Sequence, residues 1–389
     1  MRFLTINFYT SKEVNLWKDN GGIPFALSKY YGYESRYVYL NKHGITTNSL
    51  YEKYAEIDSI DSGNSNIINY FNILKYIYKN IKYYDVYNFY ELGIIGILSI
   101  FVARIKNPEI IIYNKLDMGK SIFRELTQNK SLVRKLKNYI LAKLTKNIDL
   151  YTVETKMYVN ALNNLERFNG RIKYLPNGYF SDLVEIDKNI KKEKIILTVG
   201  RLGSPKKNTE MLVSAIKNIE PEKLKGWKVY LVGPMTEEFK KWFDKEIENK
   251  PYLQELFVIT GNISDKKELY TLYARSSVFV LSSRFEGSPL VVPEALYFAC
   301  YPIITNCYDA VYEVINDSNN GFGKIIENEN AISLQSAIEE VLNGNIDYLD
   351  KGCQASKFVQ KNFDWRFIVA QLDKYIKEMS ENRLYVKRN

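Results

Sequence analysis

The chain has 389 residues and is 46% hydrophobic, which is enough for two hydrophobic cores because a single core rarely grows beyond about 250 to 300 residues. One histidine and three cysteines without metal-ligand spacing argue against the common zinc sites, and we expect neither a bound metal nor a cofactor. The net charge is +9, and residues 1–180 alone carry +10, so the first half of the chain holds the whole positive excess.

This charge distribution is typical of proteins that bind nucleic acid, an anionic membrane surface or an anionic substrate, although solvated lysines would also produce it. No nucleic-acid recognition motif is visible, so we expect no nucleic-acid partner. The opening residues, MRFLTINFYT, predict a strand and not a signal peptide. The longest apolar run, Leu92–Val102, is shorter than the roughly 20 residues that span a bilayer, so we expect a soluble, cytoplasmic protein.

Short apolar runs alternate with longer helical patterns through both halves of the chain, and several runs are continuous, as in strands buried on both faces of a parallel sheet. Two such arrays predict an α/β fold with two doubly wound, Rossmann-like domains that face each other across a cleft. The predicted strands are 3–8, 37–40, 85–89, 110–116, 150–153 and 172–175 in the first array, and 194–199, 228–232, 256–260, 278–281 and 301–305 in the second.

The first strand is followed by NLWKDNGGIPFALSKYYG, which places Gly21 and Gly22 at the start of a predicted helix. Paired glycines let the backbone approach a phosphate closely, although such a pair is more often only a turn. The third glycine of a dinucleotide-binding motif is absent. No acidic residue follows at the sequence spacing of the residue that binds the ribose hydroxyls in that motif. A dinucleotide-dependent dehydrogenase is therefore disfavoured.

Residues 129–147 combine Lys and Arg with Leu, Ile and Tyr at near-helical spacing, with Lys143 interrupting the apolar arc. The segment predicts either a helix that packs on the core or one that contacts an anionic membrane. The second alternative would place the protein at the inner face of the membrane.

The two arrays are joined by residues 174–194, where a Pro-Asn-Gly turn precedes a polar, charged stretch. We expect the domain boundary here, with a first domain over residues 1–176 and a second over residues 177–363. The last helical pattern, Trp365–Met379, could pack on either domain.

The second array opens with ILTVGRLGSPKKNTEML, a predicted strand, a loop with Arg201, Lys206 and Lys207, and a helix that begins near Asn208 or Thr209. A helix N-terminus beside several cations suits a diphosphate. An ordinary strand-to-helix turn with solvated lysines would give the same pattern.

Later in this array, RFEGSPLVVPEAL places Glu286 in a loop and Glu294 at the start of a helix predicted over 292–299. Pro293 fits the first helical turn because its missing N–H has no helical partner there. Two carboxylates at the carboxyl end of a strand can accept hydrogen bonds from vicinal hydroxyls of a sugar and of a ribose. The alternative is a solvated loop glutamate and a glutamate that favours the helix dipole.

Three stretches of the sequence together resemble elements of the family 4 glycosyltransferases (GT4). The E-x7-E element of the family is similar to EGSPLVVPE, its G-R to K-N loop to VGRLGSPKKNTEML, and its interdomain turn to YLPNG. With the preceding Gly-Gly loop they cover about the whole chain. The resemblance implies a GT-B fold and retaining, metal-independent transfer of a sugar, as by a hexosyltransferase, from a nucleotide-sugar donor to an acceptor hydroxyl. It also implies an acceptor-side first domain, a donor-binding second domain, and a final segment, residues 364–389, that crosses back to the first domain.

Carried over to this sequence, the resemblance implies that Arg201 and Lys207 hold the donor diphosphate, Glu286 binds the donor sugar and Glu294 binds the ribose. The donor would also meet Gly21 and Gly22 of the first domain, Ile263 at the nucleobase, and the backbone of Gly287, Ser288, Pro289 and Leu290. The implied catalytic residues are Glu286, Arg201, Lys207 and Asp117.

The sequence departs from the family pattern in three places. YNKLDMGK, residues 113–120, stands where many members have a histidine, so Asp117 or Lys115 would occupy that space, while His43 is expected to be inert. Ala299 replaces the family glycine after E-A-L, and DAVYE, residues 309–313, replaces a Gly-Gly loop. These changes concern the shape of the sugar pocket.

Cations and helix N-termini would stabilise the leaving nucleoside diphosphate, so no protein nucleophile is required. The expected partners are a nucleotide-sugar donor, a glycan or lipid-linked acceptor as in the assembly of cell-surface polysaccharide or glycolipid, and, as an open alternative, an anionic membrane surface. Two alternative hypotheses about the function remain open. The protein could be a nucleotide-sugar epimerase of similar architecture, or a non-catalytic sugar-binding subunit.

Overall fold

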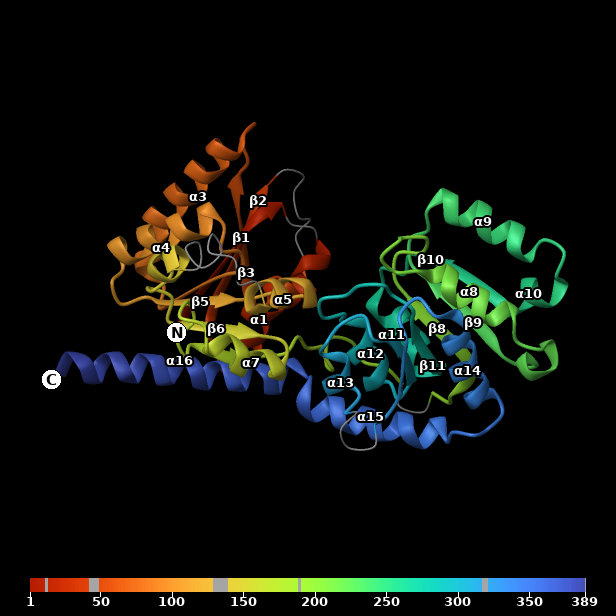
Figure 1. Cartoon of the computed structure of the whole chain (residues 1–389). Helices are drawn as coiled ribbons and strands as arrows, with labels where there is room; N and C mark the ends of the chain where they lie inside the picture. Colours follow the sequence, from red (N-terminus) through yellow and green to blue (C-terminus); the bar gives the residue numbers. More distant parts are fainter. Residues whose placement is uncertain (11–12, 42–48, 129–138, 188–189, 317–320, 389) are drawn as a thin grey trace. The chain divides into compact units, whose positions relative to one another are not determined.

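The computed structural model describes residues 1–388 apart from 11–12, 42–48, 129–138, 188–189 and 317–320. The chain forms two compact units, each with its own core (Figure 1). Unit 1 comprises Met1–Gly178 and Trp365–Asn389, and unit 2 comprises Tyr179–Asp364. The last helix of the chain therefore belongs to unit 1.

Unit 1 is built on a seven-stranded parallel sheet in the order β3-β2-β1-β4-β5-β6-β7. Its strands are β1 (Arg2–Thr10), β2 (Glu34–Asn41), β3 (Ala55–Asp61), β4 (Val86–Phe89), β5 (Ile111–Lys115), β6 (Leu150–Val153) and β7 (Ile172–Tyr174). Its α-helices are α1 (Asp19–Tyr31), α2 (Ser49–Glu52), α3 (Asn66–Asn80), α4 (Ile94–Lys106), α5 (Lys120–Gln128), α7 (Lys156–Asn163) and α16 (Trp365–Arg388), with short 3-10 helices η1 (Glu13–Trp17) and η2 (Ile81–Tyr83). The strand order reverses between β1 and β4, which is where doubly wound sheets bind ligands.

Unit 2 has a six-stranded parallel sheet in the order β10-β9-β8-β11-β12-β13. Its strands are β8 (Glu193–Val199), β9 (Lys228–Val232), β10 (Phe257–Gly261), β11 (Ser276–Leu281), β12 (Tyr301–Thr305) and β13 (Lys324–Ile326). Its α-helices are α8 (Thr209–Lys217), α9 (Glu237–Ile247), α10 (Pro251–Leu256), α11 (Lys266–Arg275), α12 (Val291–Tyr297), α13 (Val311–Val314), α14 (Ala331–Leu342) and α15 (Tyr348–Asn362), with η3 at Pro221–Leu224. The order reverses between β8 and β11.

The predicted α/β class with two doubly wound sheets is confirmed, and each of the eleven predicted strands is present. Two further strands were not predicted. In β3, whose sequence is AEIDSID, only Ala55 and Ile60 are buried, because the strand lies at the sheet edge. The other, β13, has three residues and pairs only with β12. Short or polar edge strands lack the continuous apolar run that marks a buried strand.

The cysteines do not form one class. Cys300 and Cys307 are buried, whereas Cys353 on α15 is exposed. Among the residues that the structure describes, no group of three or more His, Cys, Asp or Glu side chains is arranged to hold a metal ion.

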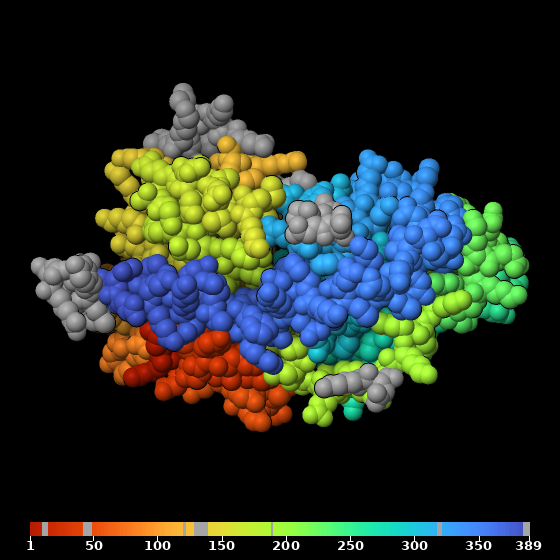
Figure 2. Space-filling view, turned by 90° about the horizontal axis from the view of Figure 1, so that it is seen from below, coloured from red at the N-terminus to blue at the C-terminus, as the bar shows by residue number. Residues whose placement is uncertain are grey.

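The helix α16 is held on unit 1 by apolar and polar contacts, and it forms the dark blue ridge in Figure 2. Its inward face buries Trp365, Val369, Leu372 and Ile376, which lie at helical spacing. The Tyr33 hydroxyl donates a hydrogen bond of 2.9 Å to the Asp373 carboxylate. Burial is therefore supported by a specific polar contact in the first half of the helix.

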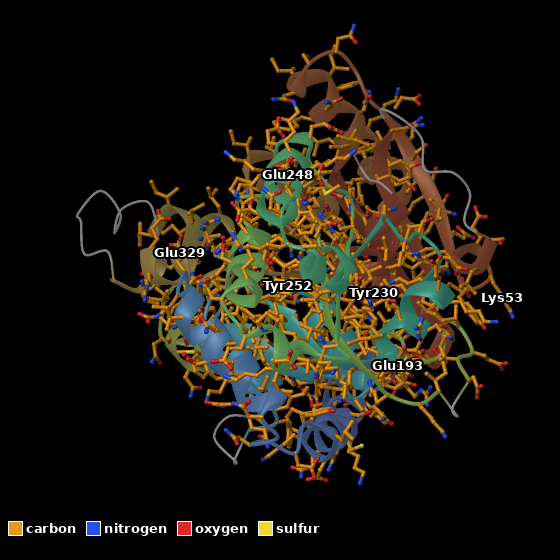
Figure 3. All side chains as sticks on the ribbon, turned by 90° about the vertical axis from the view of Figure 1, so that its right-hand side faces the viewer. Lys53, Glu193, Tyr230, Glu248, Tyr252 and Glu329 are labelled. Carbon is orange, nitrogen blue, oxygen red and sulfur yellow. The ribbon has the colours of Figure 1, made fainter. Side chains whose placement is uncertain are left out.

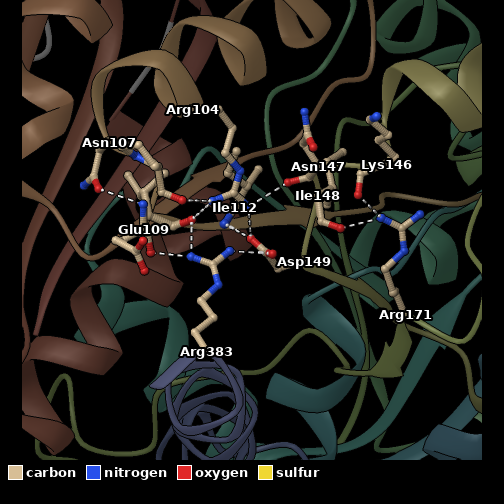
Figure 4. A network of polar contacts seen from close by, with 12 residues as sticks. Arg104, Asn107, Glu109, Ile112, Lys146, Asn147, Ile148, Asp149, Arg171 and Arg383 are labelled. Carbon is tan, nitrogen blue, oxygen red and sulfur yellow. Dashed lines mark hydrogen bonds and ion pairs between the residues drawn. The ribbon is translucent and has the colours of Figure 1, made fainter. Parts of the chain in front are cut away.

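A polar network fixes the distal part of α16 (Figure 4). The Asp149 carboxylate lies 2.6 Å from the Arg383 guanidinium and 2.5 Å from the Arg104 guanidinium, and it accepts a 2.7 Å hydrogen bond from the Ile112 N–H. Burial lowers the pKa of Arg104, although Asp149 opposes that change. One carboxylate thus joins α4, β5 and α16.

Replacing Asp149 with Ala should lower the free energy of unfolding by about 2 kcal/mol, because two partly buried guanidinium groups lose their shared counter-ion. Chemical denaturation would measure the change. Glu56→Ala is the control, since Glu56 pairs with Arg36 at an exposed site and should cost less than about 1 kcal/mol. Equal losses for the two variants would contradict a structural role for the network.

Candidate functional site

The candidate site lies in unit 2, where the loops after β8 and β11 leave the same edge of the sheet. These strands are parallel neighbours, so residues 200–208 and 282–290 lie side by side. The Arg284 N–H donates to the Lys206 carbonyl at 2.9 Å, and the Arg284 guanidinium donates to the Pro205 carbonyl at 2.6 Å. The Ser282 hydroxyl donates to the Asn208 carbonyl at 2.9 Å. Hydrogen bonds to backbone carbonyls therefore fix one loop on the other.

The ion pair between Lys207 and Glu286 lies at this junction. The Lys207 ammonium is 2.6 Å from Glu286 Oε1, and the Ser283 hydroxyl donates to the same oxygen at 2.7 Å. Glu286 is buried, and the Lys207 stem passes close to Gly200, where a Cβ would lie in van der Waals contact with it. The structure thus brings together two residues to which the resemblance gave separate roles.

The second carboxylate, Glu294, lies in the first turn of α12 and is buried. Its Oε1 is 2.8 Å from the Lys266 ammonium, at the start of α11, and accepts a 3.4 Å hydrogen bond from the Tyr270 hydroxyl. Burial, together with the charge of Glu294, raises the pKa of Tyr270 well above its usual value. Pro293 fits the first helical turn as predicted, although the helix begins at Val291 and ends at Tyr297.

Sequence reasoning missed Lys266 and Tyr308. Lys266 lies three positions after Ile263, the residue predicted at the nucleobase, but nothing in one sequence connects it with Glu294. Tyr308 follows β12, and its buried hydroxyl has no hydrogen-bond partner among the described residues. Burial, with smaller contributions from Cys307 and Glu286, raises the pKa of Tyr308 well above its usual value. A neutral hydroxyl near Glu286 is thus available as a donor.

The other predicted residues of unit 2 lie around these pairs. The side chain of Arg201 is exposed, and no described residue forms an ion pair with it. Gly287, Ser288, Pro289 and Leu290 are half-buried in the loop between the two glutamates. The residue Ile263 lines a pocket of about 360 Å³ with Tyr230, Thr260 and Arg275. Arg275 Nε lies 2.6 Å from Glu193 Oε1. Glu193 and Tyr230 are labelled in Figure 3.

In unit 1, Gly21 and Gly22 lie within α1 and are buried. A Cβ on Gly21 would come within 2.4 Å of Leu16 Cα, so the glycine is required where α1 packs against η1. The Gly21 N–H donates to the Asn20 side chain at 3.0 Å, and the Gly22 N–H donates to the Lys18 carbonyl at 2.5 Å. Packing of α1 against η1 thus gives Gly21 a structural role, and the predicted contact of Gly21 and Gly22 with the donor stays a prediction.

The residues in place of the family histidine take different positions. Lys115 is fully buried at the end of β5, 3.3 Å from Glu154 Oε1. Burial raises the pKa of Glu154 to about 7, with Lys115 opposing the change and with Asp117 and Asp19 adding to it. Asp117 is exposed. It lines a pocket of about 450 Å³ together with Asp19, Glu91 and other polar and apolar residues from the ends of β1 and β4.

His43 lies outside the described residues, as does most of the segment 129–147, since 42–48 and 129–138 are not described. Within the described part of the chain, no helix is both long enough and apolar enough to cross a membrane.

Comparison with known proteins decides the family. Residues 182–358, nearly all of unit 2, match the model of the family described as "Glycosyl transferases group 1". This part of the chain belongs to that family. Among the curated relatives, an α-1,4-N-acetyl-D-galactosaminyltransferase of Campylobacter jejuni, named for an undecaprenol-linked saccharide, is 29% identical over 179 residues. The amylovoran biosynthesis glycosyltransferase AmsD of Erwinia amylovora is 30% identical over 186 residues.

These alignments cover 46% and 48% of this chain and 47% and 50% of the two relatives, so they span about half the length of each protein. Solved structures extend the likeness in fold to 97% of the chain. The HepE protein of Anabaena, in complex with UDP and glucose, has a TM-score of 0.70 at 13% identity over 100% of its length. A sucrose-phosphate synthase of Thermosynechococcus elongatus has a TM-score of 0.68 at 16% identity over 99% of its length. The two-sheet architecture is thus the GT-B fold.

The end of α12 explains one departure from the family pattern. The Cys300 N–H donates to the Ala295 carbonyl at 3.1 Å and the Ala299 N–H to the Leu296 carbonyl at 2.9 Å, which is the Schellman arrangement. Ala299 has φ of 58°, the left-handed conformation that glycine adopts without strain. The backbone therefore keeps the geometry of a glycine although the residue is alanine.

Replacing Ala299 with Gly should raise the free energy of unfolding by about 0.5 to 1 kcal/mol, because relief of left-handed strain exceeds the added entropy of the unfolded chain. Thermal denaturation would report this as a higher Tm. The matched control is Ala295→Gly, within α12, which should lower the Tm because that residue is helical and buried. A lower Tm for Ala299→Gly would contradict the strain argument.

Proposed function

We propose that the chain is a retaining glycosyltransferase that transfers a sugar from a nucleotide-diphosphate sugar to an acceptor hydroxyl. The observation that carries the proposal is the Lys207–Glu286 pair at the joined ends of β8 and β11, in a unit that belongs to the group 1 family. Unit 2 would bind the donor and unit 1 the acceptor. Glu294 supports the proposal, since its carboxylate is buried beside Lys266 in the same loop region.

In this mechanism the donor diphosphate attracts the Lys207 ammonium away from Glu286, and Arg201 supplies a second cation from the same loop. Glu286 then accepts hydrogen bonds from donor-sugar hydroxyls, and Glu294 accepts them from the ribose. The cations stabilise the negative charge that develops on the leaving nucleoside diphosphate. The acceptor hydroxyl attacks the anomeric carbon on the face that the phosphate leaves, and the departing phosphate oxygen takes its proton.

The pocket at the ends of β1 and β4 supports a role of unit 1 in acceptor binding. Among the described residues, its lining includes the carboxylates of Asp19, Glu91 and Asp117 and the Lys18 ammonium. Such a lining favours a hydroxyl-rich ring and repels phosphate. We therefore propose that Asp117 contacts a glycan acceptor and that Gly21 and Gly22 act through packing.

We further propose that the acceptor is a glycan or lipid-linked saccharide of cell-surface polysaccharide or glycolipid assembly, used at the inner face of the membrane. The names of the Campylobacter and Erwinia relatives, the first with an undecaprenol-linked saccharide and the second with amylovoran biosynthesis, support this class of acceptor. The donor base is best tested first as uracil, since the Anabaena structure holds UDP.

Replacing Lys207 with Ala should lower turnover on the order of 100-fold, as for other lost transition-state charge contacts. Release of nucleoside diphosphate from a panel of nucleotide sugars would measure it. The matched control is Lys206→Ala, because Lys206 lies over the Phe285 ring at 5.0 Å and not against Glu286. Turnover of Lys207→Ala near that of the control would reject the assignment.

Replacing Glu294 with Gln should reduce the preference for UDP over 2′-deoxy-UDP, because the amide accepts ribose hydrogen bonds less strongly than the carboxylate. Thermal shift is the measurement, since a ligand selective for the folded protein raises Tm by mass action. A wild-type protein that UDP, GDP, ADP and dTDP all fail to stabilise would argue against nucleotide binding. An unchanged preference in the variant would reject only the ribose role of Glu294.

A further inference from the structure

The outward side of α4 carries a stripe of apolar side chains that are exposed to solvent. Ile94, Leu98, Phe101 and Ile105 are 69%, 41%, 39% and 75% exposed. Their spacing of four, three and four positions places them on one side of the helix. The opposite side already buries Ile95, Ile100 and Ala103 against the sheet, so the stripe is additional to the apolar residues that the fold requires.

The neighbouring helix α3 repeats this arrangement. Ile67, Phe71 and Tyr78 are 80%, 64% and 55% exposed at similar spacing, while Ile73 and Ile77 face the core. The two helices contact each other and lie side by side on unit 1 (Figure 1). We call these seven residues the α3–α4 face. Large apolar side chains exposed together on adjacent helices mark interaction sites.

The charged side chains on the two helices of the α3–α4 face are all basic. Neither helix contains an acidic residue. Lys75 and Lys79 are exposed on α3, and the Lys106 ammonium lies 3.6 Å from the centre of the Tyr78 ring. Lys82, just beyond α3, lies over Tyr83, which is also exposed. Apolar side chains bordered by lysines and tyrosines are the composition of surfaces that rest in a membrane interface.

We propose that the α3–α4 face docks unit 1 on an anionic lipid bilayer. A second copy of the chain fits less well, because a two-fold contact would bring Lys75 and Lys79 of both copies together without an acidic residue on either helix to neutralise them. An anionic surface instead attracts these lysines while the apolar side chains enter the interface. Arg104 does not contribute, because its guanidinium is engaged by Asp149.

The proposal goes beyond sugar transfer and does not depend on it. The α3–α4 face lies in unit 1, whereas the donor residues Lys207, Glu286 and Glu294 lie in unit 2. It also differs from the segment 129–147 that the sequence singled out, since none of its residues comes from that segment. Docking would be peripheral, with one side of two helices in the interface.

The test compares two double variants of the full chain that change net charge equally. Phe71→Glu with Ile105→Glu alters the α3–α4 face, whereas Phe367→Glu with Ile332→Glu alters one phenylalanine and one isoleucine exposed elsewhere, on α16 and α14. Co-sedimentation is measured with vesicles of phosphatidylcholine alone and with vesicles that also contain phosphatidylglycerol. The wild type and the control should bind the anionic vesicles, less at high salt, and the α3–α4 variant should bind at least about tenfold more weakly.

Equal binding of the two double variants, or no binding by the wild type, would overturn the proposal. A wild type that is a dimer in analytical ultracentrifugation, with a monomeric α3–α4 variant and no vesicle binding, would also overturn it and assign the face to self-association. The thermal shift with UDP shows whether each variant is folded. It also separates the outcomes, since loss of vesicle binding with an unchanged UDP response leaves the proposed transferase untouched.

Discussion

The ion pair between Lys207 and Glu286 joins positions 79 residues apart in the chain. It can form because β8 and β11 are parallel neighbours, so the loops that follow them emerge at one edge. A buried carboxylate is costly without a partner, and here a lysine and the Ser283 hydroxyl share its charge. The two loops are therefore coupled, and a ligand that draws on the lysine also changes the surroundings of the glutamate.

The sequence predicted those parts of the fold that are marked by burial on both faces. Continuous apolar runs identified strands such as β9 and β11, whereas β3 and β13 lie at sheet edges and lack such runs. The fold class could be found because strand and helix patterns alternate along the chain. The glutamate pair and the loop of Lys207 could be found because each is a local pattern that follows a strand. The contacts of Lys266 with Glu294, and the position of Tyr308, depend on packing between elements distant in sequence. Ala299 was recognised as a departure, but only the backbone shows that it keeps the conformation of a glycine.

The acidic and basic side chains of unit 1 gather in different places. The net excess of positive charge suggested an anionic partner, yet the pocket at the ends of β1 and β4 is lined by three carboxylates. The exposed lysines of α3 lie beside an apolar surface instead. A net charge summed over half a chain cannot distinguish the pocket from the surface, because it does not show where each charged residue lies in the fold. A surface that favours anions and a pocket that favours hydroxyls can therefore coexist in one unit.

The return of α16 to unit 1 has a consequence for biosynthesis. Trp365, Val369, Leu372 and Ile376 complete apolar packing in a unit whose other residues end at Gly178. The ribosome must therefore make all of unit 2 before unit 1 receives its last helix. During that interval the nascent unit 1 exposes an apolar strip that the finished protein covers, and such surfaces attract chaperones or aggregate. The order of synthesis thus makes the first unit to emerge the last one to be completed.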